Sequence, residues 1–140
     1  SKIYSLMFKK IKTTQMTENE LSKIVFEIGL KIHKNLGPGL FEHVYEECLF
    51  YELKKAGLKV EKQKLLPIKY EELTIENAYR LDMIVEDKLI LEIKTVDYIN
   101  SSHKAQLLTY LKMTDCRLGL LINFQSDLFK NGVTRIVNGL

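Results

Sequence analysis

The sequence lacks the features of a disulfide scaffold and of a membrane protein. Among its 140 residues there are two cysteines, two prolines and no tryptophan. The cysteines, Cys48 and Cys116, are widely separated, which excludes a disulfide-rich secreted domain and favours a reducing compartment. No apolar run approaches the ~20 residues that a membrane-spanning helix needs, and the N-terminal residues do not resemble a signal peptide. We therefore expect a cytoplasmic protein with no membrane contact.

An excess of charge of one sign is also lacking. With 21 basic and 18 acidic residues the net charge is +3, which does not by itself predict a nucleic-acid partner. Only three basic residues are arginine, the residue suited to reading bases, so any nucleic-acid contact is expected at the phosphate backbone. Five lysines in the middle of the chain form either a solvated basic face or a path for that backbone: Lys54, Lys55, Lys59, Lys62 and Lys64.

The remaining composition is that of one folded domain. Hydrophobic residues make up 46% of the chain, which is too many for a disordered protein and enough for one core. Residues 1–16 carry lysines but no acid, so we interpret them as a basic lead-in and residues 17–140 as a single domain.

Apolar spacing in the first part of the chain predicts two helices. Thr17 and Glu20 match a capping box, which opens a helix that ends near 35–37. Gly37-Pro38-Gly39 then breaks the chain, and a second helix is expected from about 40 to 56, before Gly57.

From Leu58 the apolar period changes to two, which is typical of strands. Asn100 offers a cap for one more helix, which carries the apolar positions between 105 and 111. The order α-α-β-β-β-α-β-(β) predicts an α/β fold of the α+β kind, with helices flanking a mixed central sheet. The expected strands cover about 60–70, 75–85, 89–96, 118–124 and, at an edge, 132–137.

Acidic side chains interrupt two of these apolar strands. Glu92 and Lys94 share one face of the third strand because side chains alternate. If the preceding turn is centred on Asp87 and has three residues, Asp82 lies opposite Glu92 across the hairpin. Opposed carboxylates repel each other unless a cation lies between them. The pair therefore predicts either a metal site or a structural ion pair with Lys94.

Two helices carry further candidates for a site. Glu42 and Tyr45 are three residues apart, and Gln106 and Tyr110 are four apart, so each pair shares a helix face. Glu42 is equally explained as a first-turn acid that the helix dipole favours, and Tyr110 as a core residue. His103, near Gln106, is a candidate for contact with a substrate phosphate.

These residues together resemble a known family. Asp82 followed by Glu92-x-Lys94 is similar to the motif of the PD-(D/E)XK nuclease superfamily, although Leu81 stands where that motif has proline. Gly39-x-x-Glu42-x-x-Tyr45 resembles the pattern that names the GxxExxY proteins, a branch of the superfamily. Gln106-x-x-x-Tyr110 is similar to the helix motif of its exonuclease-like members. The resemblance covers roughly residues 17 to 126.

The resemblance implies a restriction-endonuclease-like core and hydrolysis of phosphodiester bonds in nucleic acid, DNA rather than RNA. By this resemblance Asp82, Glu92, the Ile93 carbonyl and Glu42 hold Mg²⁺, or Mn²⁺ in its place. Lys94 orients the attacking water or stabilises charge on the phosphate. The residues implied in positioning the substrate are Gln106, Tyr110, Tyr45 and His103.

Two alternatives remain open at this stage. One is an inactive nuclease-fold module that binds nucleic acid or acts as an adaptor. The other is a structural protein in which the acids and Lys94 form an internal ion-pair network. A single small domain offers little surface for a duplex, so a homodimer is a further arrangement suggested by analogy.

Overall fold

The computed structural model describes residues 15–140, so most of the expected basic lead-in lies outside the described residues. Met16 is buried against the core. The sheet and helices confirm the predicted α+β class, and η2 is a short 3₁₀ helix that the sequence pattern did not predict. In chain order the elements are α2 (Glu18–Leu36), α3 (Glu42–Lys55), β1 (Val60–Tyr70), β2 (Leu73–Val85), β3 (Leu89–Lys94), α4 (Ser101–Thr114), β4 (Leu118–Asn123), η2 (Phe129–Gly132) and β5 (Val133–Val137).

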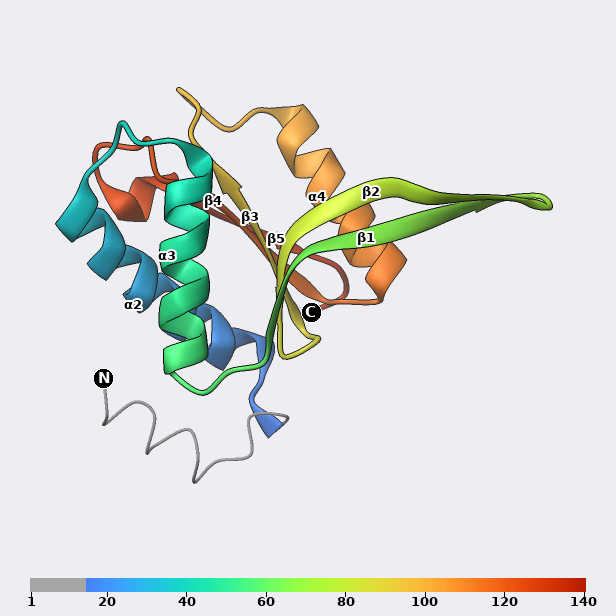
Figure 1. Ribbon diagram of the computed structural model, residues 1–140, viewed down its shortest axis with the longest axis horizontal. Coiled ribbons are helices and arrows are strands. Elements are labelled where there is room, and N and C mark those ends of the chain that lie inside the picture. Colours follow the sequence, from blue (N-terminus) through green and yellow to red (C-terminus); the bar gives the residue numbers. More distant parts are fainter. Residues whose placement is uncertain (1–14) are drawn as a thin grey trace.

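The five strands form one mixed sheet in the order β1-β2-β3-β4-β5. All neighbours are antiparallel except β3 and β4, which are parallel and joined through α4. Helices α2 and α3 pack on one face of the sheet and α4 on the other (Figure 1). Every residue of β4 is buried, and β3 is buried except at its last residue, because both strands lie in the middle of the sheet.

The predicted caps decide where two of the helices begin. The Thr17 hydroxyl accepts from the Glu20 N–H and the Glu20 carboxylate accepts from the Thr17 N–H, which confirms the capping box. Asn100 caps α4 in the same reciprocal way with His103. Within residues 15–140, no helix has the length and apolar character to cross a bilayer.

Strands β1 and β2 form a long hairpin whose distal half projects from the body as an arm (Figure 1). The pairing shifts register between Leu66 and Ile68. Near the tip, Tyr70 and Leu73 are paired with each other and exposed. Strand β2 therefore begins at Leu73, two residues before the predicted start.

The turn between β2 and β3 sets the register that positions the site. Three residues, 86–88, separate the strands, and Val85 pairs with Leu89. This register confirms the turn centred on Asp87. The last β2–β3 pair is Met83 with Leu91. Beyond it β2 turns away from β3 with β1 (Figure 1), and the strands open into a fork at Asp82 and Glu92.

Candidate functional site

The carboxylates of Asp82 and Glu92 lie in the fork between β2 and β3. The Asp82 N–H donates to Glu92 Oε2 at 2.7 Å, and the Ile93 N–H donates to Asp82 Oδ2 at 2.8 Å. Both N–H groups lie just past the last β2–β3 pair. Part-buried backbone donors need new acceptors, which the two side chains supply. The fork therefore fixes both acids in place.

Burial and mutual repulsion make this pair costly to ionise. Glu92 is only 4% exposed. Its burial, together with the neighbouring Asp82 carboxylate, raises the pKa of Glu92 to about 8. Burial also raises the pKa of Asp82, against the lowering effect of the Ile93 N–H. A cation bound between the two acids would remove this penalty.

Lys94 lies at the end of β3, on the strand face that carries Glu92. Its charge lowers the pKa of both acids. No carboxylate of residues 15–140, however, lies within 4.0 Å of its ammonium group. The acids and Lys94 thus do not form the close ion-pair network of the structural alternative.

The backbone around Lys94 is held by the neighbouring strand β4. The Phe124 N–H donates to the Lys94 carbonyl at 3.0 Å. The buried Asn123 side chain accepts from the Val96 N–H and donates to the Val96 carbonyl. Asn123 is therefore a supporting residue that the sequence analysis missed, because an asparagine at a strand end is also typical of an ordinary turn.

Glu42 lies near the two acids without forming a ligand cluster with them. It is the first residue of α3 and is exposed. Its charge raises the pKa of both Asp82 and Glu92. Nevertheless, no three His, Cys, Asp or Glu side chains among residues 15–140 are grouped to hold a metal ion. Two carboxylates are in place, and their hard oxygen atoms suit Mg²⁺ or Mn²⁺.

Two residues that the sequence analysis did not single out complete this side of the site. Gln63 lies on β1 opposite Asp82, and its amide donates to Glu46 Oε1 at 2.6 Å. The same side chain lies close enough to Asp82 to lower the pKa of that carboxyl. Burial is the main cause of a raised pKa at Glu46, and Asp82 adds to it. Because Glu46 follows Glu42 by one helical turn, the i,i+4 spacing was the available signal.

The residues predicted on α4 approach the acids from the other face of the sheet. Tyr110 is buried, and its hydroxyl donates to the Arg80 carbonyl at 3.4 Å. Burial, with Glu92 and Asp82 nearby, raises the pKa of Tyr110 to about 12. Gln106, one turn earlier, is exposed. The predicted sharing of a face therefore brings Tyr110, but not Gln106, into the interior.

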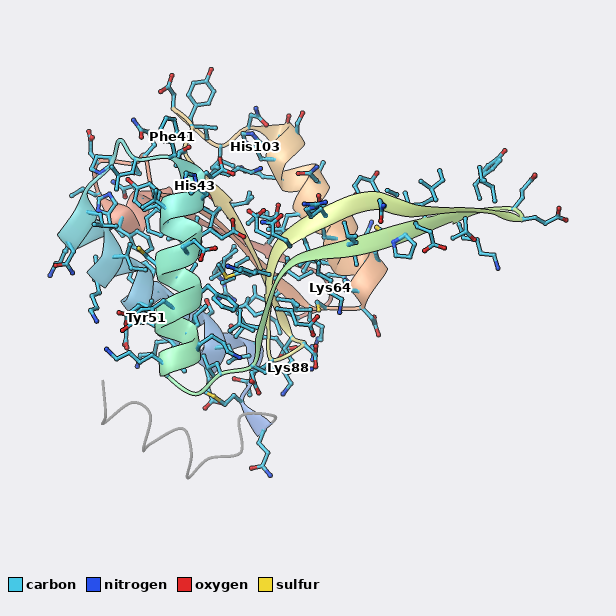
Figure 2. The ribbon with its side chains drawn as sticks, viewed as in Figure 1. Phe41, His43, Tyr51, Lys64, Lys88 and His103 are labelled. Carbon is cyan, nitrogen blue, oxygen red and sulfur yellow. The ribbon has the colours of Figure 1, made fainter. Side chains whose placement is uncertain are left out.

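The start of α4 carries His103, whose Nδ1 accepts from the Asn100 N–H at 3.1 Å. This hydrogen bond places the proton of the neutral ring on Nε2, which is then a donor. Figure 2 places His103 at the same end of the molecule as Phe41 and His43, where α3 begins. His43 is exposed.

Tyr45 lies in the core, and not at a surface where it could position a substrate as the resemblance implies. Its side chain is fully buried and stacks on Phe124, with ring centroids 4.4 Å apart. The hydroxyl donates to the Gly37 carbonyl at 2.5 Å and accepts from the Leu40 N–H at 3.2 Å. Tyr45 therefore holds the loop before α3 and has no surface with which to contact a substrate.

Three of the five clustered lysines are paired with acids. Lys59 lies 2.7 Å from Asp87, and Lys62 forms an ion pair with Glu47. Lys64, on β1 (Figure 2), lies 3.7 Å from Glu61, three residues before it. These partners favour the interpretation of a solvated, charge-balanced face over a continuous path for a nucleic-acid backbone.

The fold and the paired acids define a nuclease-like α+β protein. A family model described as the PD-(D/E)XK nuclease superfamily matches residues 19–136, and the chain belongs to this superfamily. No curated protein and no solved structure matches the chain.

Proposed function

We propose that this protein is a metal-dependent nuclease of the GxxExxY branch, which hydrolyses phosphodiester bonds in DNA rather than RNA. The observation that carries the proposal is the pair of carboxylates, Asp82 and Glu92, fixed side by side in the fork. Burying two like charges without a close cationic partner is unfavourable. Such a pair is expected where a bound cation and a reaction require it.

Asp82 and Glu92 would hold Mg²⁺, or Mn²⁺ in its place. Glu42, near the acids but outside a ligand cluster, would contribute through water, and the Ile93 carbonyl is the further oxygen ligand that the family resemblance implies. When bound, the ion polarises a phosphoryl oxygen and lowers the pKa of its water.

The remaining residues would orient the substrate and supply charge. Lys94, close enough to lower the pKa of both acids, would orient the attacking water or stabilise charge on the phosphate. Gln106 on the exposed side of α4 and the Nε2 donor of His103 are suited to contact phosphate oxygens. Tyr110, buried on the α4 side of the sheet and near enough to both acids for their charges to raise its pKa, would support them from that side.

A cleavage assay tests this proposal. The wild type is incubated with single- and double-stranded DNA and RNA, with Mg²⁺, Mn²⁺ or a chelator, beside Lys94→Ala. Metal-dependent cleavage that Lys94→Ala abolishes, with nucleic-acid binding retained, is the expected result. Binding without cleavage by the wild type would favour the adaptor alternative. The absence of both binding and cleavage would contradict a role with nucleic acid.

A further inference from the structure

Gln63 has a backbone conformation that its place in a strand does not explain. Its φ is +55°, in the left-handed region that residues other than glycine rarely adopt. The flanking pairs, Lys62 with Met83 and Lys64 with Leu81, keep one register. Gln63 is thus neither at the hairpin turn nor at the register shift beyond Leu66. Backbone strain of this kind gathers where a side chain must take a particular position.

The side chain of Gln63 lies between acids from two different elements. Its amide donates to Glu46 on α3 at 2.6 Å, and its place opposite Asp82 on β2 brings it close enough to lower the pKa of that carboxyl. A glutamine NH₂ group carries two N–H donors, so one amide can serve two carboxylates at once. The strained backbone thus places the uncharged Gln63 amide, with its two N–H donors, between Glu46 on α3 and Asp82.

We propose that Gln63 is a positioning residue that holds the Asp82 carboxylate in its working orientation and is itself oriented by Glu46. The inference rests on the proposed function, since the working orientation is the one that binds the metal. It adds a link from α3 through β1 to β2 that runs through side chains outside the family motifs.

Substitution by glycine separates the side chain of Gln63 from its backbone. Glycine adopts a φ of +55° without a steric penalty, so Gln63→Gly removes the amide while relieving strain. The matched control is Glu71→Gly, because Glu71 also has a positive φ, 52°, but lies in the exposed turn at the tip of the arm. Both variants are expected to melt at or above the wild-type temperature.

The expected result is a loss of metal binding and cleavage in the Gln63 variant and no loss in its Glu71 control. Gln63→Gly lowers the Mn²⁺ affinity and the kcat for cleavage about 10-fold or more, whereas Glu71→Gly leaves both at the wild-type value. Glu46→Ala gives a similar loss, and the double variant loses no more than either single one, because the two residues act in one chain of contacts. In metal-free protein at fixed pH, the Asp82 carboxyl ¹³C resonance shifts in Gln63→Gly and stays in place in Glu71→Gly.

Different results would contradict the role of Gln63 and the proposed nuclease function. A wild type that binds Mn²⁺ and cleaves, with Gln63→Gly equal to it in affinity, kcat and Asp82 resonance, overturns the inference and leaves the proposed function standing. A wild type that binds no Mn²⁺ contradicts the proposed function, and the working role of Gln63 falls with it even if the Asp82 resonance shifts.

Discussion

Asp82 and Glu92 are joined reciprocally across the fork, because each carboxylate accepts a backbone N–H from the strand of the other. Removing either side chain would therefore also leave a part-buried N–H without its acceptor. Asparagine and glutamine keep an acceptor oxygen in nearly the same place. Asp82→Asn and Glu92→Gln are consequently the variants that separate the charge of the site from the integrity of the fold.

The raised pKa of Glu92 predicts how stability depends on pH. Between the usual pKa of 4.5 and its folded value of about 8, the folded protein holds a proton that the unfolded chain has released. In the absence of metal, the contribution of this group to stability is therefore fully present below about pH 4.5. It is lost as the pH rises through about 8. Glu92→Gln should flatten this decline.

Urea denaturation at pH 5, 6.5 and 8.5, with a chelator present, measures the effect. The free energy of unfolding of Glu92→Gln should exceed that of the wild type by more at pH 8.5 than at pH 5. Parallel pH curves for the two proteins would show that Glu92 does not titrate in this range.

Lys94→Ala should abolish cleavage with little effect on folding. Lys94 is half-buried and forms no close ion pair within the described part of the chain, so its loss breaks no such pair. We expect kcat to fall by about 10²-fold or more, the usual cost of a donor aimed at developing charge. Lys54→Ala, an exposed charge-matched control at the end of α3, should retain wild-type kcat.

Tyr45→Phe tests the structural placement of Tyr45. The substitution removes the donor to the Gly37 carbonyl and the acceptor of the Leu40 N–H. We expect the free energy of unfolding to drop by about 1–2 kcal/mol, while KM and kcat for cleavage stay within about twofold of wild type. A large rise in KM with unchanged stability would restore the substrate-contact role.

The fold was predictable where local signals and hydrophobic pattern agree. The Thr17 and Asn100 caps and the three-residue turn around Asp87 each depend on residues close in the chain. The projecting arm was not predictable in the same way. Strand alternation near Tyr70 indicates a hairpin, but it does not tell whether a hairpin with two exposed faces lies on the body or leaves it.

The site was predictable only in its motif residues. The register that joins Asp82 and Glu92 follows from the turn, whereas the contact of Gln63 depends on a positive φ that no residue pattern signals at a glutamine. Tyr45 was misplaced because helix spacing gives a shared face without telling whether that face meets solvent or core. The preference for DNA and a homodimer stay predictions.

Calorimetric titration of Mg²⁺ and Mn²⁺ into the wild type, Asp82→Asn and Glu92→Gln tests the proposed metal site. All three proteins are first shown to have the same fold by circular dichroism and hydrogen exchange. We predict saturable binding of either ion by the wild type and at least a tenfold loss of affinity in each variant. Equal affinities in all three proteins, or no binding by the wild type up to millimolar metal, would contradict a metal site in the fork.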